Sequence, residues 1–212
     1  MSMQSLLCEL LPAGVWHFEG LLTEVQQRLL LSVARDIAKS APFVTPVDGY
    51  RGEHKFQTTN CGEWGWHSSA QGVYYASRHP ETRSLYPAFP VEVAQVVRQA
   101  VCEARIAGFV PDSCQINYLQ APEGKWPTHV DDKERDREAP VIIFGLGNTA
   151  CLNVWGGREE DRLADIELAS GDVAILAGPA RKYRYGFTEV QPDTSELVRN
   201  QAHIQMICRR VG

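Results

Sequence analysis

The stretch Pro127-Thr128-His129-Val130-Asp131-Asp132 decides how this chain is interpreted, because it places an imidazole and a carboxylate two residues apart. On a β-strand, side chains at positions i and i+2 project from the same face, so His129 and Asp131 would point together into a cavity. They would supply two ligands of a 2-His-1-carboxylate site for Fe(II), whose second imidazole comes from elsewhere in the chain. The same short pattern also suits an exposed polar pair on an edge strand, so the surrounding sequence must decide.

Short strands follow one another through the C-terminal half of the chain, separated by turn residues such as Gly156-Gly157 and Ser170-Gly171. We predict eight strands, at 114–119, 128–131, 141–146, 150–155, 164–168, 172–176, 181–187 and 202–209. A further entry strand is expected within 14–18, and two helices at 23–41 and 91–108. This order predicts an α+β, mainly β fold: a jelly-roll-like barrel buttressed by N-terminal helices.

The first predicted helix opens with a capping box formed by Thr23 and Gln26, and an apolar stripe is expected along its buried side. The members of that stripe are Val25, Leu29, Val33 and Ile37. The second helix carries a broader apolar stripe, and Gly108 is expected to end it. Both helices are therefore expected to cover a sheet.

Residues 42–90 are rich in Gly, Pro, Thr, Asn and aromatic residues. Such a segment suits a lid in which aromatic faces and small polar groups hold a planar ligand. A small satellite core beneath surface loops is the alternative, and the two interpretations are compatible.

Composition bounds the remaining possibilities. The chain has 212 residues, 44% of them apolar, which is enough for one sizeable domain. Its net charge of −5 gives no overall basic excess for nucleic acid, although a local basic face is compatible with it. Six scattered cysteines, from Cys8 to Cys208, and the absence of a leader or a long apolar run predict a reduced cytoplasmic protein that is not embedded in a membrane.

Several motifs run in order along residues 40–210: Phe43-Val44-Thr45-Pro46, Gly49-Tyr50, Thr59-Asn60-Cys61-Gly62, Gly65-Trp66, Gln71-Gly72, Pro111-Asp112, Cys114, Ile116-Asn117, His129-Val130-Asp131, Gly156-Gly157, Gly171-Asp172-Val173, Arg181 and Gly186. Together they resemble the AlkB-type branch of the non-haem iron, 2-oxoglutarate-dependent dioxygenases. The resemblance implies a single domain over residues 1–212, with a double-stranded β-helix core at 112–212 and a substrate-recognition lid at 42–90.

The resemblance also implies a chemistry. Fe(II) and 2-oxoglutarate would activate oxygen to hydroxylate a carbon, and hydroxylated N-methyl groups would then be lost as aldehyde. His129 and Asp131 would bind the iron. The candidate substrate-binding residues are Trp66, Tyr75, Lys133 and Arg181, and the substrate would be a planar small molecule, a nucleobase or nucleic acid.

One departure concerns the third iron ligand. The family's pattern reads Arg-x-x-x-His-Gly, whereas this chain has Tyr185 between Arg181 and Gly186 at the position of that imidazole. A phenol with a pKa of about 10 is neutral at pH 7 and a poor ligand for Fe(II), although a metal can lower that pKa. Tyr185 would bind a metal as phenolate, hold a water that does, or fill a vacated site.

A second departure concerns the co-substrate. The family anchors 2-oxoglutarate with two arginines six residues apart, because a guanidinium matches a carboxylate. This chain has His203 and Arg209 at those positions. Arg209 would keep that role together with Asn117, while His203 would contact the co-substrate, replace the missing metal ligand or pack in the core.

Three functions remain compatible with these residues. The first is an oxygenase with a modified site that acts on an alkylated nucleobase, a nucleotide or another planar substrate. The second is a catalytically silent descendant of the same fold that binds a nucleotide, nucleic acid or protein. The third is a cupin-like metal enzyme that uses no 2-oxoglutarate.

Overall fold

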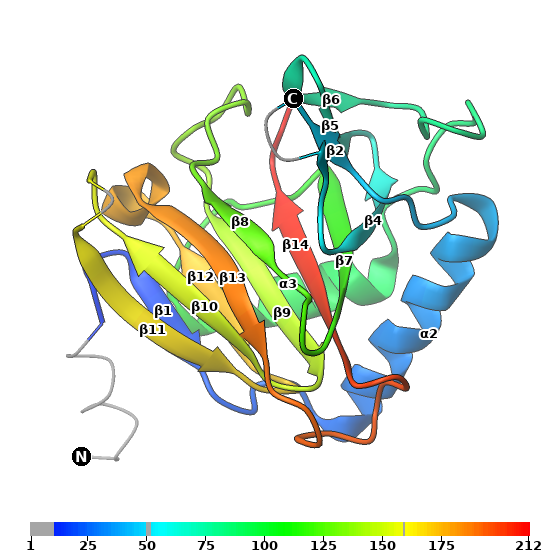
Figure 1. The fold of residues 1–212 in the computed structure, drawn as a ribbon. Helices are drawn as coiled ribbons and strands as arrows, with labels where there is room; N and C mark the ends of the chain where they lie inside the picture. The colour runs from blue at the N-terminus through cyan, green and yellow to red at the C-terminus, as the bar shows by residue number, and fades with distance from the viewer. Residues whose placement is uncertain (1–10, 50–51, 159) are drawn as a thin grey trace.

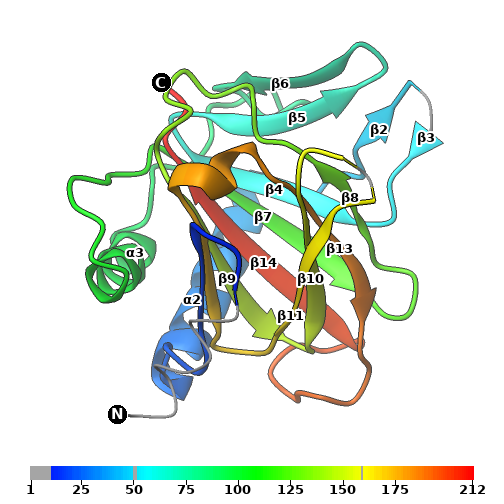
Figure 2. The same cartoon turned by 90° about the vertical axis from the view of Figure 1, so that its left-hand side faces the viewer.

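Two antiparallel β-sheets pack face to face at the centre of the structure, and two helices cover the outer side of the larger sheet (Figures 1 and 2). The computed structural model describes residues 11–49, 52–158 and 160–212. Cys8 and Tyr50 therefore lie outside the described residues. This mainly β architecture with N-terminal helices confirms the predicted fold class.

The larger sheet has the strand order β1 (Val15–Phe18), β12 (Val173–Leu176), β9 (Val141–Gly147), β14 (Ala202–Arg209), β7 (Ser113–Gln120) and β4 (Gln57–Gly62). The smaller sheet has the order β11 (Arg162–Leu168), β10 (Ala150–Trp155), β13 (Arg184–Val190) and β8 (Trp126–His129). Two hairpins lie above one end of the sheets: β2 (Val47–Asp48) with β3 (Gly52–Glu53), and β5 (Gly65–Ser69) with β6 (Gly72–Ala76) (Figure 2).

Alternation along the strands divides the core into two clusters. On β9, Ile142 and Phe144 face the helices, whereas Val141 and Ile143 face the smaller sheet. The inner cluster fills the space between the two sheets, except at the end beneath the hairpins, where polar side chains gather.

The first helix, α2 (Glu24–Ser40), begins as predicted, since the Thr23 and Gln26 side chains each bond the other's backbone N–H. The predicted stripe was wrong at its start, because Val25 and Leu29 are exposed. The buried residues of α2 are Leu30, Leu31, Ala34 and Ile37. Leu29, Leu30 and Leu31 are consecutive, so an apolar stripe with helical spacing can run through Leu29 or through its two successors. Packing on the sheet buries Leu30 and Leu31 and leaves Leu29 exposed.

The second helix, α3 (Val91–Glu103), ends five residues before the predicted stop. Arg105 adopts a positive φ of 56° and the Ile106 N–H bonds the Val101 carbonyl, which closes the helix without a glycine. No helix in the described part of the chain is long and apolar enough to cross a membrane.

The predicted strands match eight observed ones, with two corrections. The predicted strand 181–187 begins instead with a 3-10 helix, η2 (Gly178–Lys182), which Pro179 initiates, and β13 follows it. The predicted strand 128–131 is β8, which ends at His129, so Asp131 lies in the loop beyond it. Because Asp131 is not on the strand, the rule that side chains two residues apart share a face does not by itself explain why Asp131 and His129 point toward each other.

Asp172, from the Gly171-Asp172 motif, ties β1 to the core. Its carboxylate accepts hydrogen bonds from the backbone N–H groups of Gly20 and Ala169, at 2.7 and 3.0 Å, and contacts His17 Nε2 at 3.0 Å. The Asp172 side chain is buried, whereas Ala169 is half-buried and Gly20 is exposed.

We expect Asp172→Ala to lower the free energy of unfolding by about 2 kcal/mol, because two backbone N–H groups lose their hydrogen bonds to a buried carboxylate. Urea denaturation followed by circular dichroism measures this. Asp36→Ala is the control, since the Asp36 to Lys39 pair lies on the exposed side of α2 and should contribute about 0.5 kcal/mol or less. Equal shifts for the two variants would contradict this role for Asp172.

Candidate metal centre and its cavity

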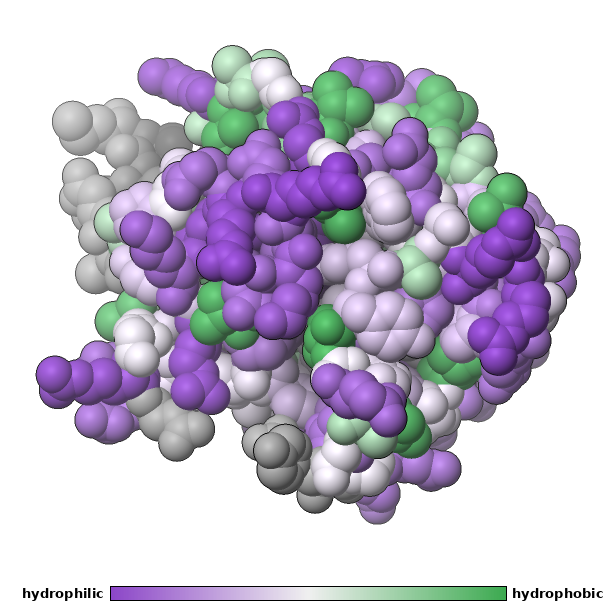
Figure 3. Space-filling model, turned by 90° about the horizontal axis from the view of Figure 1, so that it is seen from above, coloured by the Kyte–Doolittle hydropathy of each residue, from purple (hydrophilic) through white to green (hydrophobic). Residues whose placement is uncertain are grey.

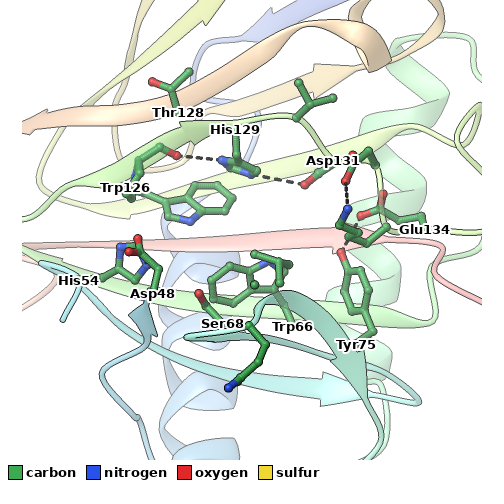
Figure 4. Close-up of a pocket in the computed structure, with 17 residues that line it drawn as sticks. Asp48, His54, Trp66, Ser68, Tyr75, Trp126, Thr128, His129, Asp131 and Glu134 are labelled. Atoms are coloured by element: carbon green, nitrogen blue, oxygen red, sulfur yellow. Dashed lines mark hydrogen bonds and ion pairs between the residues drawn. The ribbon is translucent and has the colours of Figure 1, made fainter. Parts of the chain in front are cut away.

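A cavity of about 700 Å³ lies between the two hairpins and the end of β8; Figure 4 shows it with the hairpins below. Its roof comes from the hairpins: Asp48, His54, Trp66, Ser68, Gln71, Gly72, Val73 and Tyr75. Its floor is the continuous run from Trp126 to Glu134, which includes His129, Asp131 and Lys133. The volume lies within the usual range for small-molecule sites.

His129 and Asp131 point at each other across the floor of this cavity (Figure 4). His129 Nδ1 lies 2.9 Å from the Pro127 carbonyl oxygen, which can only accept, so Nδ1 carries a proton and donates it to that oxygen. The other nitrogen, Nε2, is buried without a hydrogen-bond partner and lies 3.3 Å from Asp131 Oδ1. His129 Nε2 and Asp131 Oδ1 thus converge on one position, as two ligands of the same metal ion do.

These two atoms fit a divalent transition-metal ion. Nitrogen and oxygen ligands bind such ions at about 2.0–2.2 Å, so neighbouring ligand atoms lie about 3 Å apart. A metal-binding histidine also commonly donates its second N–H to a backbone carbonyl, as His129 does to Pro127. The chemistry of the donor pair and the unpartnered Nε2 therefore both suit iron.

Two hydrogen bonds fix the second carboxylate oxygen of Asp131, Oδ2. Arg209 Nε donates to Oδ2 at 2.6 Å, and the Tyr185 hydroxyl donates to the same atom at 2.5 Å. Burial alone would raise the pKa of the Asp131 carboxyl, but the contacts with Arg209 and His129 together outweigh burial and hold the pKa well below its usual range. Asp131 is thus an ionised carboxylate with Oδ1 turned toward His129.

Tyr185 reaches this position because β13 lies tightly against β8. It is the cross-strand partner of His129, and the next residue, Gly186, lies so close to β8 that a Cβ there would be 2.7 Å from the Trp126 carbonyl oxygen. Burial raises the pKa of the Tyr185 phenol well above its ordinary value, so the hydroxyl keeps its proton and donates it to Asp131. In the described part of the chain, no three His, Cys, Asp or Glu side chains converge as metal ligands.

Three buried charged side chains surround the Asp131 carboxylate, and we refer to Asp131, Glu134, Arg181 and Arg209 together as the charge cluster. Arg181 Nη2 lies 3.5 Å from Glu134 Oε2, and its Nη1 lies 4.0 Å from Asp131 Oδ2. Arg209 Nε is also 3.7 Å from Glu134 Oε1. Two positive and two negative charges balance, which is what allows them to stay ionised away from water.

A row of polar side chains continues inside the barrel, from Arg209 along β7 and β14. Arg209 Nη1 donates to Gln115 Oε1, Gln115 to Asn117, and Asn117 to Gln205 Oε1, at 2.9, 3.0 and 3.2 Å. Gln205 Nε2 is buried without a partner. Gln205 and Arg209 carry donors of the kind that bind the oxygen atoms of a 2-oxo acid, but neither lines the cavity, and Arg209 already donates to Asp131, Gln115 and Tyr185.

His203 stands at the far end of the same row, six residues from Arg209 on β14. Its Nδ1 lies 2.5 Å from the Asn148 carbonyl oxygen, and burial lowers its pKa to about 4. The imidazole is therefore neutral and presents the unpartnered Nε2 as an acceptor. It offers no positive charge to a carboxylate, and it lies apart from His129 and Asp131.

Aromatic rings form the walls of the cavity. Trp66 comes from the roof and Trp126 from the floor, and each packs on Phe56, at 6.3 and 6.4 Å between ring centroids (Figure 4). Trp126 also lies 4.3 Å from the His129 ring. These faces suit a planar ligand held close to His129.

The structure thus places the predicted residues in three groups. Trp66, Tyr75 and Lys133 line the cavity with His129 and Asp131. Tyr185, Arg209 and Arg181 lie behind Asp131, and Arg181 contacts the charge cluster rather than the cavity. Asn117 and His203 lie deeper in the barrel.

Sequence reasoning missed several cavity residues, among them Trp126, Glu134, Asp48 and His54. Trp126 and Glu134 flank the central motif, and a strand predicted to begin at Trp126 rather than Thr128 would have included Trp126. Asp48 and His54, which form an ion pair at 3.4 Å, come from a two-residue strand and its neighbour. No sequence pattern indicates that this pair faces the cavity.

Comparison with known sequences gives a consistent result. Residues 14–211 match the family described as the 2OG-Fe(II) oxygenase superfamily. The chain is 38% identical to the alpha-ketoglutarate-dependent dioxygenase AlkB of Salmonella typhimurium, over 74% of this chain and 70% of that protein. It is 33% identical to the AlkB homolog of Caulobacter vibrioides, over 92% and 86% of the two chains.

Two solved structures share the fold of this chain. The structure of OsALKBH1 superposes with a TM-score of 0.80 and 23% identity, and covers 94% of this chain and 99% of that one. A Pseudomonas putida prolyl-4-hydroxylase superposes with a TM-score of 0.54 and 12% identity, over 99% and 100% of the two chains.

The convergence of His129 Nε2 and Asp131 Oδ1 predicts that the protein binds one divalent cation at these two residues. Calorimetric titration with Mn(II), or with Fe(II) without oxygen, should show one site in the wild type. His129→Ala should weaken binding by at least about 100-fold, because losing even an outer partner of a ligand typically costs 10–100-fold.

His54→Ala is the matched control, since His54 is another histidine of the same cavity and should leave the metal affinity within about twofold. A wild type that binds no metal, or equal affinities for the three proteins, would refute the assignment. Tyr185→His, which supplies an imidazole at the third position, should raise the affinity.

Proposed function

The chain belongs to the AlkB branch of the 2OG-Fe(II) oxygenase superfamily, and from this premise we propose that it oxidises alkyl groups on the nucleobases of nucleic acid. One observation supports the proposal most directly: His129 Nε2 and Asp131 Oδ1 converge to 3.3 Å at a cavity with aromatic walls.

In this proposal His129 and Asp131 hold Fe(II), and Tyr185 orients Asp131 in place of a third protein ligand. Arg209, Asn117 and the free amide of Gln205 hold the co-substrate, with His203 as a neutral neighbour. When bound, iron and 2-oxoglutarate supply the activation of oxygen, and the protein contributes position and charge. The single domain over residues 1–212 is part of the same proposal.

The substrate class follows from the cavity and from the names of relatives. Trp66 and Trp126 offer flat faces on opposite sides of the opening, and a base turned out of a nucleic acid stack is recognised by such faces. The face that carries the hairpins is largely hydrophilic, with apolar atoms scattered over it (Figure 3). An Arabidopsis thaliana relative, 29% identical over 69% of this chain and 36% of its own length, is named a DNA N(6)-methyladenine demethylase.

Substrate selection would rest on the cavity more than on overall charge, since the net charge of −5 opposes a polyanion. Lys133 is the exposed cation of the cavity lining, and it pairs with Asp132 at 3.0 Å. We assign Lys133 to contact with the base or with a flanking phosphate.

A silent binding protein with the same fold is the alternative, and Tyr185 at the third ligand position is the observation in its favour. The site itself counts against it. A vestigial pair would have no reason to keep Oδ1 of Asp131 oriented, by two hydrogen bonds to its other oxygen, toward an unpartnered nitrogen.

The proposal predicts turnover on a methylated oligonucleotide. Purified protein with Fe(II), 2-oxoglutarate and oxygen should convert an N-methylated base to the unmodified base, with equal amounts of succinate and formaldehyde. His129→Ala should fall to background, because it removes one of two protein ligands. Mass spectrometry of the oligonucleotide and a succinate assay measure the two products.

Succinate without demethylated base would indicate an oxygenase with another substrate. Absence of both products, together with tight binding of the oligonucleotide, would favour the silent protein and overturn the proposal.

A further inference from the structure

We infer that Tyr75 is a positioning residue whose hydroxyl fastens the roof of the cavity to the charge cluster behind the metal centre. The inference rests on the proposed function, because it assigns Tyr75 to substrate binding at the same site. By roof we mean the hairpin of β5 and β6, residues 65–76.

A single short hydrogen bond carries the connection. The Tyr75 hydroxyl donates to Glu134 Oε1 at 2.6 Å, across 59 positions of sequence (Figure 4). In the part of the chain that the structure describes, no other hydrogen bond joins residues 65–76 to the floor segment 126–138. Glu134 is 4% exposed, so water competes little for this bond.

The acceptor is itself fixed. Glu134 lies 3.5 Å from Arg181 and 3.7 Å from Arg209, and both arginines contact Asp131. The Tyr75 hydrogen bond therefore connects the roof to the same charge cluster that orients the Asp131 carboxylate. A hydrogen bond to a charged group is stronger than one between neutral partners.

Apart from its antiparallel pairing with β5, the outer strand of the roof, β6, has few buried contacts. On β5, Trp66 is anchored to β4, since its backbone N–H and carbonyl both bond the Asn60 side chain. On β6, residues 72–74 are exposed, and only Tyr75 and Ala76 are half-buried. A segment with few buried contacts opens easily, so the Tyr75 bond should dominate the position of β6.

This position matters for the cavity. Gln71, Gly72, Val73 and Tyr75 all line it, and Tyr75 is the cross-strand partner of Trp66, the proposed stacking residue. Side chains of cross-strand partners lie on the same face, so a shift of Tyr75 moves the wall next to Trp66. Tyr75 should therefore govern how tightly substrate is held, while the chemical step at His129 and Asp131 proceeds as before.

The test is Tyr75→Phe, which keeps the ring and removes only the hydroxyl. Tyr74→Phe is the matched control: Tyr74 is adjacent on β6 but is 46% exposed and stacks on His67, away from Glu134. For the methylated oligonucleotide, Tyr75→Phe should raise KM about tenfold, the equivalent of one net hydrogen bond, and leave kcat within about twofold. Tyr74→Phe should leave both unchanged.

Amide hydrogen exchange provides a second measurement that needs no turnover. Residues 72–76 should exchange faster in Tyr75→Phe than in the wild type or Tyr74→Phe, with unchanged exchange in β9 and β14 as the sign of an intact barrel. If the wild type shows no turnover, the proposed function fails and exchange alone decides the inference.

In an active enzyme, an unchanged KM overturns the inference whatever the exchange shows, and so does a loss of kcat at constant KM, which would place Tyr75 in the chemical step. In an inactive one, equal exchange of residues 72–76 in the three proteins overturns it.

Discussion

His129 Nε2 and Asp131 Oδ1 lie 3.3 Å apart and point at one position inside the protein, as two ligands of one metal ion do. Residues of β13 and β14 at this end of the barrel hold Asp131 in that orientation. β13 packs against β8 closely enough to require Gly186, which brings the Tyr185 hydroxyl to the far oxygen of Asp131. The last strand brings Arg209 to the same atom. The carboxylate can therefore turn only its other oxygen toward the imidazole.

Stability alone gives no reason for the charge cluster. Burying two arginines and two carboxylates costs several kcal/mol of desolvation per ion, which their mutual attraction only offsets, whereas removing one partner typically costs about 3–5 kcal/mol. The charge cluster does fix the orientation of two carboxylates, Asp131 and Glu134. It fixes Asp131 toward the metal position on one side, and on the other it offers Glu134 to the roof through Tyr75. One network thus connects the reactive end of the barrel with the segment that closes over it.

The sequence allowed the fold class, the capping box at Thr23 and the His129 and Asp131 pair to be predicted, because each depends on local pattern or on a resemblance in motif order. It misplaced the buried side of α2, since the leucines at 29–31 satisfy two helical phases and only packing chooses. It gave no indication that Glu134 accepts from Tyr75, because that contact joins a hairpin to a loop 59 residues away. Long-range polar contacts of this kind leave no periodic trace in a sequence.

The central claim is that a metal ion occupies the space between His129 and Asp131. The most direct measurement is a crystal structure of the protein soaked with Mn(II) in the absence of oxygen, with anomalous differences recorded at the manganese edge. The account predicts one strong peak about 2.2 Å from both His129 Nε2 and Asp131 Oδ1. No peak there, with the imidazole and carboxylate in direct contact as an ion pair, would contradict it.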